Sequence, residues 1–303
     1  MKKKLVALLA MSLSAVMLLA GCGTKTDSTN PGAASTAESS TADTASGDNS
    51  TSGDSSEATQ DTFKVGMEAG YAPFNWTQTG DANGGVAIED SADFAGGYDV
   101  EIAKKIADGL GKKLVIVKTE WDGLVPALTS GKIDAIIAGM SPTAERKETI
   151  DFSDNYYRSN LVMVVKKGGK YETAKSIQDF KGAKITAQLN TFHYSVIDQI
   201  EGVKKETAMD NFPAMRVALE SGIIDGYVSE RPEGVSASAA NENFAMVEFT
   251  DGFKTSDDDT AIAVGIAKGS ELTPKINEIL AGISEEERTS IMDAAIANQP
   301  AAQ

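Results

Sequence analysis

The fold is decided by one stretch, Ala138-Gly-Met-Ser-Pro-Thr-Ala-Glu-Arg146-Lys-Glu-Thr-Ile-Asp151-Phe-Ser-Asp154-Asn-Tyr-Tyr157. It follows the apolar run Asp134–Ala138, which is typical of a buried strand. Ser141 followed by Pro142 predicts a helix start, with a hydroxyl at the N-cap and proline at the first helical position. A strand that turns through Gly139 into a helix leaves backbone N–H groups free, and these favour an anion.

Arg146 follows within the predicted helix, and its planar, permanently charged guanidinium suits a carboxylate. Taken alone, the S-P-T-x-x-R pattern is better explained by a surface helix whose arginine is solvated. The whole run Ala138–Tyr157, however, resembles the signature of the family 3 extracytoplasmic solute-binding proteins, which deliver polar amino acids to ABC importers. In that family the Ser/Thr and the Arg of this stretch hold the α-carboxylate of the ligand.

The first residues, Met1–Cys22, have the features of a bacterial lipoprotein signal peptide. Three lysines precede the apolar run Leu5–Ala20, which is shorter than the ~20 residues that a membrane-spanning helix needs. The run ends in Leu19-Ala20-Gly21-Cys22, which resembles a lipobox, in which the cysteine is lipidated. Cys22 is the only cysteine, so an intrachain disulfide is excluded.

Residues 23–61 are rich in Ser, Thr, Ala, Gly, Asp and Asn, with scarcely one large apolar side chain. Such a segment buries too little surface to offset its chain entropy, so we expect a disordered tether. A lipid anchor with a polar tether predicts a lipoprotein on the outer leaflet of the cell membrane. By analogy, the long tether favours a Gram-positive bacterium.

The charge of the chain is −16. The signal segment holds three lysines, and the tether holds seven acids and one lysine, which leaves −13 on Thr62–Gln303. So acidic a core argues against nucleic acid as a partner, because nucleic-acid binding needs clustered Lys and Arg. The remaining chain, about 240 residues, fits one large domain or two of ordinary size.

Strands and helices alternate along this part of the chain. Phe63–Glu68 and Lys113–Lys118 have strand character, and Tyr98–Leu110 has apolar residues at helical spacing, which together predict doubly wound α/β structure. The run Ala127-Leu-Thr-Ser-Gly-Lys-Ile-Asp-Ala135 is echoed by Ala218-Leu-Glu-Ser-Gly-Ile-Ile-Asp-Gly226. An echo this short is also compatible with chance or with ordinary βαβ patterning, but it suggests two similar lobes that present strand-end loops to a shared cleft.

The resemblance covers roughly Phe63–Gly282 and implies a definite α/β architecture. It is the two-lobed periplasmic-binding-protein type II fold, in which each lobe is a doubly wound sheet and the ligand cleft lies between lobes joined by a hinge. We expect residues 62–156 plus 261–303 to form lobe 1 and residues 157–260 to form lobe 2.

The resemblance also assigns the two ends of a bound zwitterion. Arg146, with the backbone N–H groups of Ser141 and Thr191, is expected to bind the α-carboxylate. Glu230, the Ser141 hydroxyl and the Gly139 carbonyl are expected to bind the α-ammonium. Together these groups satisfy both charges of a ligand that leaves water. The family usually has aspartate where this chain has Glu230.

A further group aligns with the positions that clasp the ligand side chain. Two aromatic faces can hold a cation or an aliphatic stem, and a carboxylate at the end of the slot selects a cation or an amide N–H. The lobe 1 side of this slot is assigned to Glu68, Tyr71 and Trp121. The lobe 2 loop that covers it is assigned to Gln188, Asn190 and Phe192.

Several of these residues have a purely structural alternative. Glu230 could pair with Arg231 on the surface, and Tyr71 and Trp121 could be ordinary core aromatics. His193, the only histidine, is expected on a helix surface or in helix packing. A single histidine without a nearby cysteine makes a metal site improbable, and no metal or cofactor is expected.

The favoured function is therefore an amino-acid receptor for an ABC importer, without catalytic residues. The acidic slot with two aromatics places a cationic L-amino acid, arginine or lysine, ahead of glutamine, with cystine also open. An enzyme related to dehydratases, built on the same scaffold, and a signalling ectodomain are the competing hypotheses. We expect a monomer whose partners are the free amino acid, the permease subunits of the importer and, through its lipid, the membrane.

Overall fold

The computed structural model describes residues 61–300. The expected signal peptide with Cys22, and the tether up to residue 60, lie outside the described residues. Among residues 61–300, no helix combines the length and the apolar composition needed to cross a membrane.

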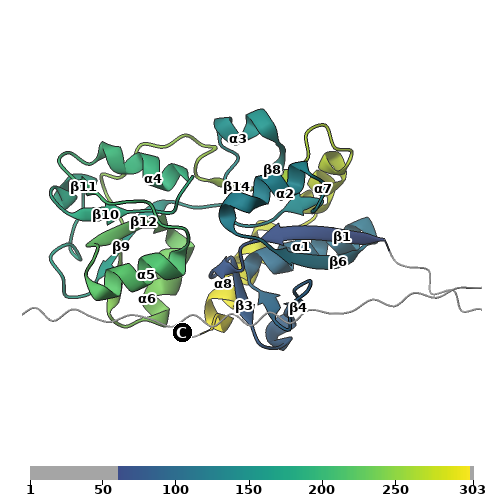
Figure 1. The fold of residues 1–303 in the computed structure, drawn as a ribbon, viewed down its shortest axis with the longest axis horizontal. Helices are drawn as coiled ribbons and strands as arrows, with labels where there is room; N and C mark the ends of the chain where they lie inside the picture. The colour runs from purple at the N-terminus through teal and green to yellow at the C-terminus, as the bar shows by residue number, and fades with distance from the viewer. Residues whose placement is uncertain (1–60, 301–303) are drawn as a thin grey trace, which may run out of the picture. The chain divides into compact units, whose positions relative to one another are not determined.

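The first lobe is built on a five-stranded sheet with the order β6-β1-β7-β14-β8 (Figure 1). The neighbours β6, β1 and β7 are parallel, whereas β14 runs antiparallel to β7 and β8. The bounds are β1 Thr62–Met67, β6 Lys113–Lys118, β7 Ala135–Ile136, β8 Asp151–Arg158 and β14 Ala261–Ile266.

Helices and a small second sheet cover this lobe. Helix α1 contacts β6, α2 contacts β1 and β7, and α7 contacts β8. The helices are α1 Tyr98–Leu110, α2 Leu124–Thr129, α3 Ala144–Thr149, α7 Leu272–Ala281 and α8 Glu285–Asn298, with 3₁₀ turns η1 Ala82–Gly84 and η2 Trp121–Gly123. The small sheet has the order β2-β3-β5-β4, with β2 Gly70–Tyr71, β3 Asn75–Gln78, β4 Val86–Ala87 and β5 Phe94–Gly96.

The second lobe repeats this plan with the strand order β11-β10-β12-β9-β13. Helix α4 lies on one face of this sheet, and α5 and α6 lie on the other (Figure 1). The strands are β9 Leu161–Lys166, β10 Lys184–Thr186, β11 Lys204–Lys205, β12 Gly226–Glu230 and β13 Phe244–Val247. The helices are α4 Phe192–Val196, α5 Phe212–Ser221 and α6 Arg231–Ala240, with 3₁₀ turns η3 Ile177–Phe180 and η4 Ile197–Gln199. The predicted two-lobed α/β class is confirmed.

One buried apolar cluster runs from the first lobe into the α5 and α6 side of the second. Its link between the sheets is aromatic: the ring of Tyr71 stacks on Phe212, with centroids 4.3 Å apart and planes 9° apart. A second cluster fills the α4 side of lobe 2. The lobes are thus joined by apolar packing as well as by the connecting chain.

The predicted helix start at Ser141-Pro142 is wrong. Helix α3 begins at Ala144, and its N-cap is Thr143, whose hydroxyl accepts the N–H of Arg146 at 3.4 Å. Ser141 is used elsewhere, because its hydroxyl donates to the carbonyl of Asp259 at 2.9 Å. Ser141 is a residue type that caps helices well, but its hydroxyl is used in this tertiary contact, and the helix begins after it.

A buried ion pair joins α5 to α6 in the second lobe. Arg216 donates from Nη2 and Nε to Glu233 Oε1, at 2.8 and 3.1 Å, and Tyr227 donates its hydroxyl to the same oxygen at 2.9 Å. The Glu233 carboxylate is fully buried. Helix α6 begins directly after Glu230, so this pair also holds in place the helix that follows Glu230.

We predict that Arg216→Met lowers the free energy of unfolding by about 3–5 kcal/mol, because it leaves the Glu233 carboxylate buried without a counter-charge. Urea denaturation followed by circular dichroism measures the loss. The double variant Arg216→Met/Glu233→Leu should recover most of it, since both charges are then gone. Additive losses in the double variant would contradict the ion-pair explanation.

Candidate functional site

The loops at the strand ends of both lobes meet, and most of the predicted site residues lie in this seam. Several of the hydrogen bonds that cross between the lobes involve residues predicted for the site. They join Arg146 to Asn190, Asn190 to Asp122, Gln188 to Glu68, and Tyr71 to Glu230.

The cationic end of the site is Arg146, in the first turn of α3. Its Nη1 donates to the carbonyl of Ser141 at 2.9 Å, and its Nη2 donates to the carbonyl of Asn190 at 3.1 Å. The guanidinium carbon lies 5.1 Å above the ring of Trp121, which is a cation–π distance. Burial lowers the pKa of Arg146 to about 10, so the side chain is still charged at neutral pH.

The lobe 2 loop before α4 reaches across to lobe 1. The Asn190 side chain donates to Asp122 Oδ1 at 2.9 Å, and its backbone has φ +55°, a region that asparagine tolerates better than most residues. Gln188 donates to Glu68 Oε2 at 3.1 Å and to the carbonyl of Asp210 at 3.0 Å. The Thr191 hydroxyl donates to the Gln188 carbonyl at 2.7 Å, which fixes the loop where α4 begins.

The anionic end of the site is Glu230, the last residue of the fully buried strand β12. Only 1% of its surface is exposed, and Oε2 accepts the Tyr71 hydroxyl at 3.3 Å. The proposed surface pair with Arg231 is absent from the described residues, because Arg231 pairs with Glu248 at 2.8 Å instead. Glu230 is thus a buried carboxylate without a Lys or Arg partner within residues 61–300.

A second buried acid, Asp99 of α1, lies behind this end. It accepts hydrogen bonds from Asn75 and from the Tyr156 hydroxyl, both at 2.8 Å, and the Tyr156 oxygen accepts the Gly139 N–H at 3.3 Å. The pKa of Asp99 is raised to about 7, mainly by burial and in part by the charge of Glu230, while the hydrogen bonds from Asn75 and Tyr156 oppose the shift. Two buried acids, Glu230 and Asp99, therefore lie where the resemblance assigns an ammonium.

Gly139 is required by a close approach. Its φ of +62° lies in the left-handed region, and a Cβ at this position would lie 2.7 Å from Cε1 of Tyr71. Only glycine allows the chain to turn here while the Tyr71 ring keeps its place between Phe74 and Phe212.

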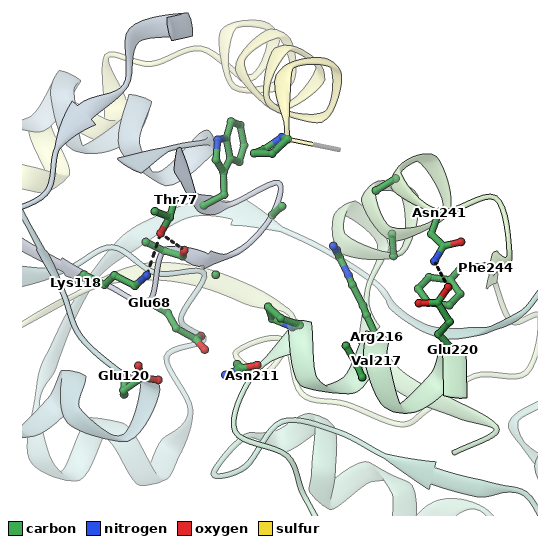
Figure 2. Close-up of a pocket in the computed structure, with 18 residues that line it drawn as sticks. Glu68, Thr77, Lys118, Glu120, Asn211, Arg216, Val217, Glu220, Asn241 and Phe244 are labelled. Carbon is green, nitrogen blue, oxygen red and sulfur yellow. Dashed lines mark hydrogen bonds between the residues drawn. The ribbon is translucent and has the colours of Figure 1, made fainter. Parts of the chain in front are cut away.

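Glu68 follows β1 and lies at the edge of a cavity of about 460 Å³ between the lobes (Figure 2). Burial raises the pKa of Glu68 to about 7, although the hydrogen bond from Gln188 opposes this shift. Lys118 and Glu120 line the cavity from lobe 1, and Arg216 and Glu220 line it from lobe 2 (Figure 2).

Four functional candidates were missed by sequence reasoning. Asp122 bridges to Asn190, Phe212 stacks on Tyr71, Asp99 adds a buried charge, and His193 lies 3.5 Å from Glu230. Asp122 directly follows the predicted Trp121, so its position was a usable signal. The other three lie on helices whose sequence pattern is also satisfied by ordinary packing.

The arrangement offers a guanidinium at one end and a buried carboxylate at the other, with aromatic rings between. This arrangement suits a small molecule that carries both charges, because within residues 61–300 neither fixed charge has a full counter-charge. Among residues 61–300, no group of three or more His, Cys, Asp or Glu is placed to hold a metal ion.

The fold is that of a two-lobed solute-binding protein. Residues 63–294 match the family described as bacterial extracellular solute-binding proteins, family 3, and the chain belongs to that family.

Relatives with named ligands are amino-acid-binding proteins. The chain is 27% identical to the arginine-binding extracellular protein ArtP of Bacillus subtilis, with 76% of this chain and 84% of ArtP covered. It is 30% identical to the L-cystine-binding protein TcyJ of Escherichia coli, with 74% and 78% covered.

A similar solved structure is also that of an amino-acid-binding protein. An amino acid ABC transporter substrate-binding protein from Streptococcus pneumoniae, bound to L-arginine, superposes with a TM-score of 0.69 at 29% identity. The superposition covers 78% of this chain and 94% of the other. The family consists of transport receptors, so the chain is not an enzyme, and the dehydratase-like hypothesis is discarded.

We predict that the free energy of unfolding falls as the pH rises from about 4 to about 7. In this range the native Asp99 carboxyl keeps a proton that the unfolded chain has released, so the native state binds more protons and loses stability with rising pH. The contribution is up to about 1.4 kcal/mol per pH unit. Urea titrations at pH 5 and pH 7.5 measure this fall in the free energy of unfolding. The fall should be smaller in Asp99→Asn than in the wild-type protein. Equal differences in both proteins would exclude Asp99 as the source.

Proposed function

We propose that this chain is an extracytoplasmic receptor that binds a cationic L-amino acid, arginine or lysine, and delivers it to an ABC importer. The observation that carries the proposal is the buried Glu230 carboxylate, which lacks a Lys or Arg partner among the described residues and lies in the same seam as Arg146. A buried charge of this kind costs several kcal/mol unless a counter-charge reaches it. The ammonium of an amino acid supplies that charge.

The α-carboxylate takes the place of backbone oxygens around Arg146. The guanidinium is now satisfied by the carbonyls of Ser141 and Asn190, and a carboxylate accepts from the same fork with a stronger, charge-assisted geometry. The N–H groups of Ser141 and Thr191 complete this end. The Gly139 carbonyl and the Ser141 hydroxyl join Glu230 around the ammonium, since that hydroxyl donates to Asp259 and keeps its lone pairs free.

The ligand side chain runs between Tyr71 and Trp121 toward Glu68, with Gln188, Asn190 and Phe192 covering it. The cationic choice rests on Glu68 and on the similarity to arginine-binding relatives. Glutamine is the second candidate, because Glu68 already accepts an amide N–H from Gln188 at 3.1 Å. The similarity to a cystine-binding protein keeps cystine as a third.

The membrane side of the proposal rests on sequence alone. Cys22 is proposed as the lipidated residue that anchors the receptor to the outer leaflet, with the residues up to 61 as its tether. The lobes are proposed as residues 62–156 plus 261–303 and residues 157–260. The permease subunits of the importer are the proposed protein partners of a monomeric receptor.

A thermal-shift screen of the purified protein against the twenty amino acids, ornithine and cystine tests the function. A ligand that binds only the folded state stabilises it by about 2.7 kcal/mol at a hundredfold excess over its Kd. We expect shifts with arginine or lysine and none in the matched variant Arg146→Ala, which loses the carboxylate fork. Wild-type protein that responds to none of these ligands would refute the receptor hypothesis, and an unchanged shift in Arg146→Ala would refute the zwitterion geometry.

We predict that Glu68→Gln weakens arginine binding at pH 8 by about thirtyfold or more, because losing one partner of a buried charge pair costs about 2 kcal/mol or more. Glutamine binding should change far less. Since the pKa of Glu68 is about 7, wild-type affinity for arginine should rise from pH 6 to pH 8 more steeply than that of the variant. Isothermal titration calorimetry measures both. Equal losses for arginine and glutamine would remove Glu68 from the specificity slot.

A further inference from the structure

His193 is buried against the anionic end of the site. It lies in the first turn of α4, only 7% exposed, and its Nε2 is 3.5 Å from Oε1 of Glu230. The ring also packs on Phe192, with centroids 4.3 Å apart. Within the described residues, neither ring nitrogen has a hydrogen-bond partner, and Oε1 of Glu230 has none either.

Protonation of the imidazole would pair Nε2 of His193 with Oε1 of Glu230 through opposite charges. A proton on the imidazole creates a cation beside a buried carboxylate, and both groups are then paired. A neutral ring offers the carboxylate at most one uncharged N–H in addition to the hydroxyl of Tyr71, and it leaves the charge of Glu230 without a counter-charge. Histidine is the side chain whose charge ordinarily changes between pH 5 and 8, which makes it the residue type suited to couple binding at a carboxylate to pH.

We propose that His193 and the α-ammonium of the ligand compete for the Glu230 carboxylate, so that binding expels a proton from His193 and acid weakens binding. This inference deepens the proposed function and rests on its assignment of the ammonium to Glu230. Thermodynamic linkage makes the competition reciprocal. The factor by which protonation of His193 lowers the affinity for ligand equals the factor by which bound ligand lowers the affinity of His193 for its proton.

Other ionisable groups surround the pair, and none of them supplies a second cation. Tyr71 of β2, Asp99 of α1, Tyr157 of β8 and Glu233 of α6 are all acids, and the pKa of each of the two tyrosines and of Asp99 is raised, mainly by burial and in part by Glu230. Two nearby arginines are committed elsewhere, Arg231 to Glu248 and Arg216 to Glu233. His193 is thus the basic side chain that reaches Glu230 within residues 61–300.

The competition holds for any amino acid, because every one carries the α-ammonium. It acts at the end of the ligand opposite to its specificity slot. Glu68 and His193 therefore make separable contributions to pH dependence: Glu68 responds to the ligand side chain, and His193 responds to the group that all ligands share.

The first test uses the single histidine of the chain, whose ring gives one NMR signal in protein carrying no histidine tag. At pH 6 we expect the signal at the position of a charged ring in wild-type protein. In Glu230→Gln, without ligand, it should move toward the neutral-ring position. A signal already at the neutral position in wild type, or the same position in both proteins, would overturn the proposal whether or not any amino acid binds.

The second test adds L-arginine. At pH 6 the ring signal of wild-type protein should move toward the neutral position, and calorimetry in two buffers of different ionisation enthalpy should detect proton release. From pH 8 to pH 6 wild type should lose up to about tenfold more affinity than His193→Gln, in which an amide replaces the titratable ring. His193→Asn is the second variant, and circular dichroism checks that each variant is folded.

Asp99→Asn separates the other buried acid. If His193→Gln loses as much affinity between pH 8 and pH 6 as wild type does, and Asp99→Asn loses less, Asp99 is the proton source and the proposal is wrong. If arginine does not bind wild-type protein at pH 8, the proposed ligand class fails instead, and the ligand-free NMR comparison still decides the His193–Glu230 pair.

Discussion

The burial of one carboxylate, that of Glu230, is the interaction on which the rest of this site depends. The strand β12 carries it into the interior, and α6 begins directly after it. An ionised carboxylate is expensive to remove from water, and here the described protein offers it a tyrosine hydroxyl and a histidine ring rather than a Lys or Arg. Lobe 1 supplies the tyrosine and lobe 2 the histidine. The seam between the lobes is therefore arranged around a charge that a ligand can complete.

The opposite charge, on Arg146, is held differently. Its guanidinium donates one hydrogen bond to a backbone oxygen of each lobe and covers the face of Trp121. Backbone carbonyls carry only partial charge, so a carboxylate is the better partner for the same fork. In this conformation the protein's own groups thus occupy the positions at which we propose that a zwitterion binds. Apolar contact between Tyr71 and Phe212 supports the seam beneath these polar groups.

Three buried acids, Glu68, Asp99 and Glu230, lie in or behind this seam. Burial raises the pKa of Glu68 and of Asp99 to about 7, so the native state carries groups whose ionisation it disfavours. Such groups weaken the folded state while they favour a bound cation, a balance typical of functional sites. The Arg216–Glu233 pair differs from these acids, because its two charges are matched within the protein. This pair joins α5 to α6.

The sequence by itself determined what is local. Helical periodicity and a terminal glycine gave α1 at its observed bounds, Tyr98–Leu110, and the alternation of strands with helices gave the α/β class. The resemblance in Ala138–Tyr157 pointed to the family and to the residues that now lie together. The start of α3 could not be predicted, because Ser141 bonds to Asp259 instead of capping the helix. Nor could the pairing of Tyr71 with Glu230, which are 159 residues apart, or the place of His193 beside that same acid. Only the tertiary structure decided these contacts, because local propensity depends on neighbours in the chain, whereas burial and charge pairing depend on which strand ends the fold brings together.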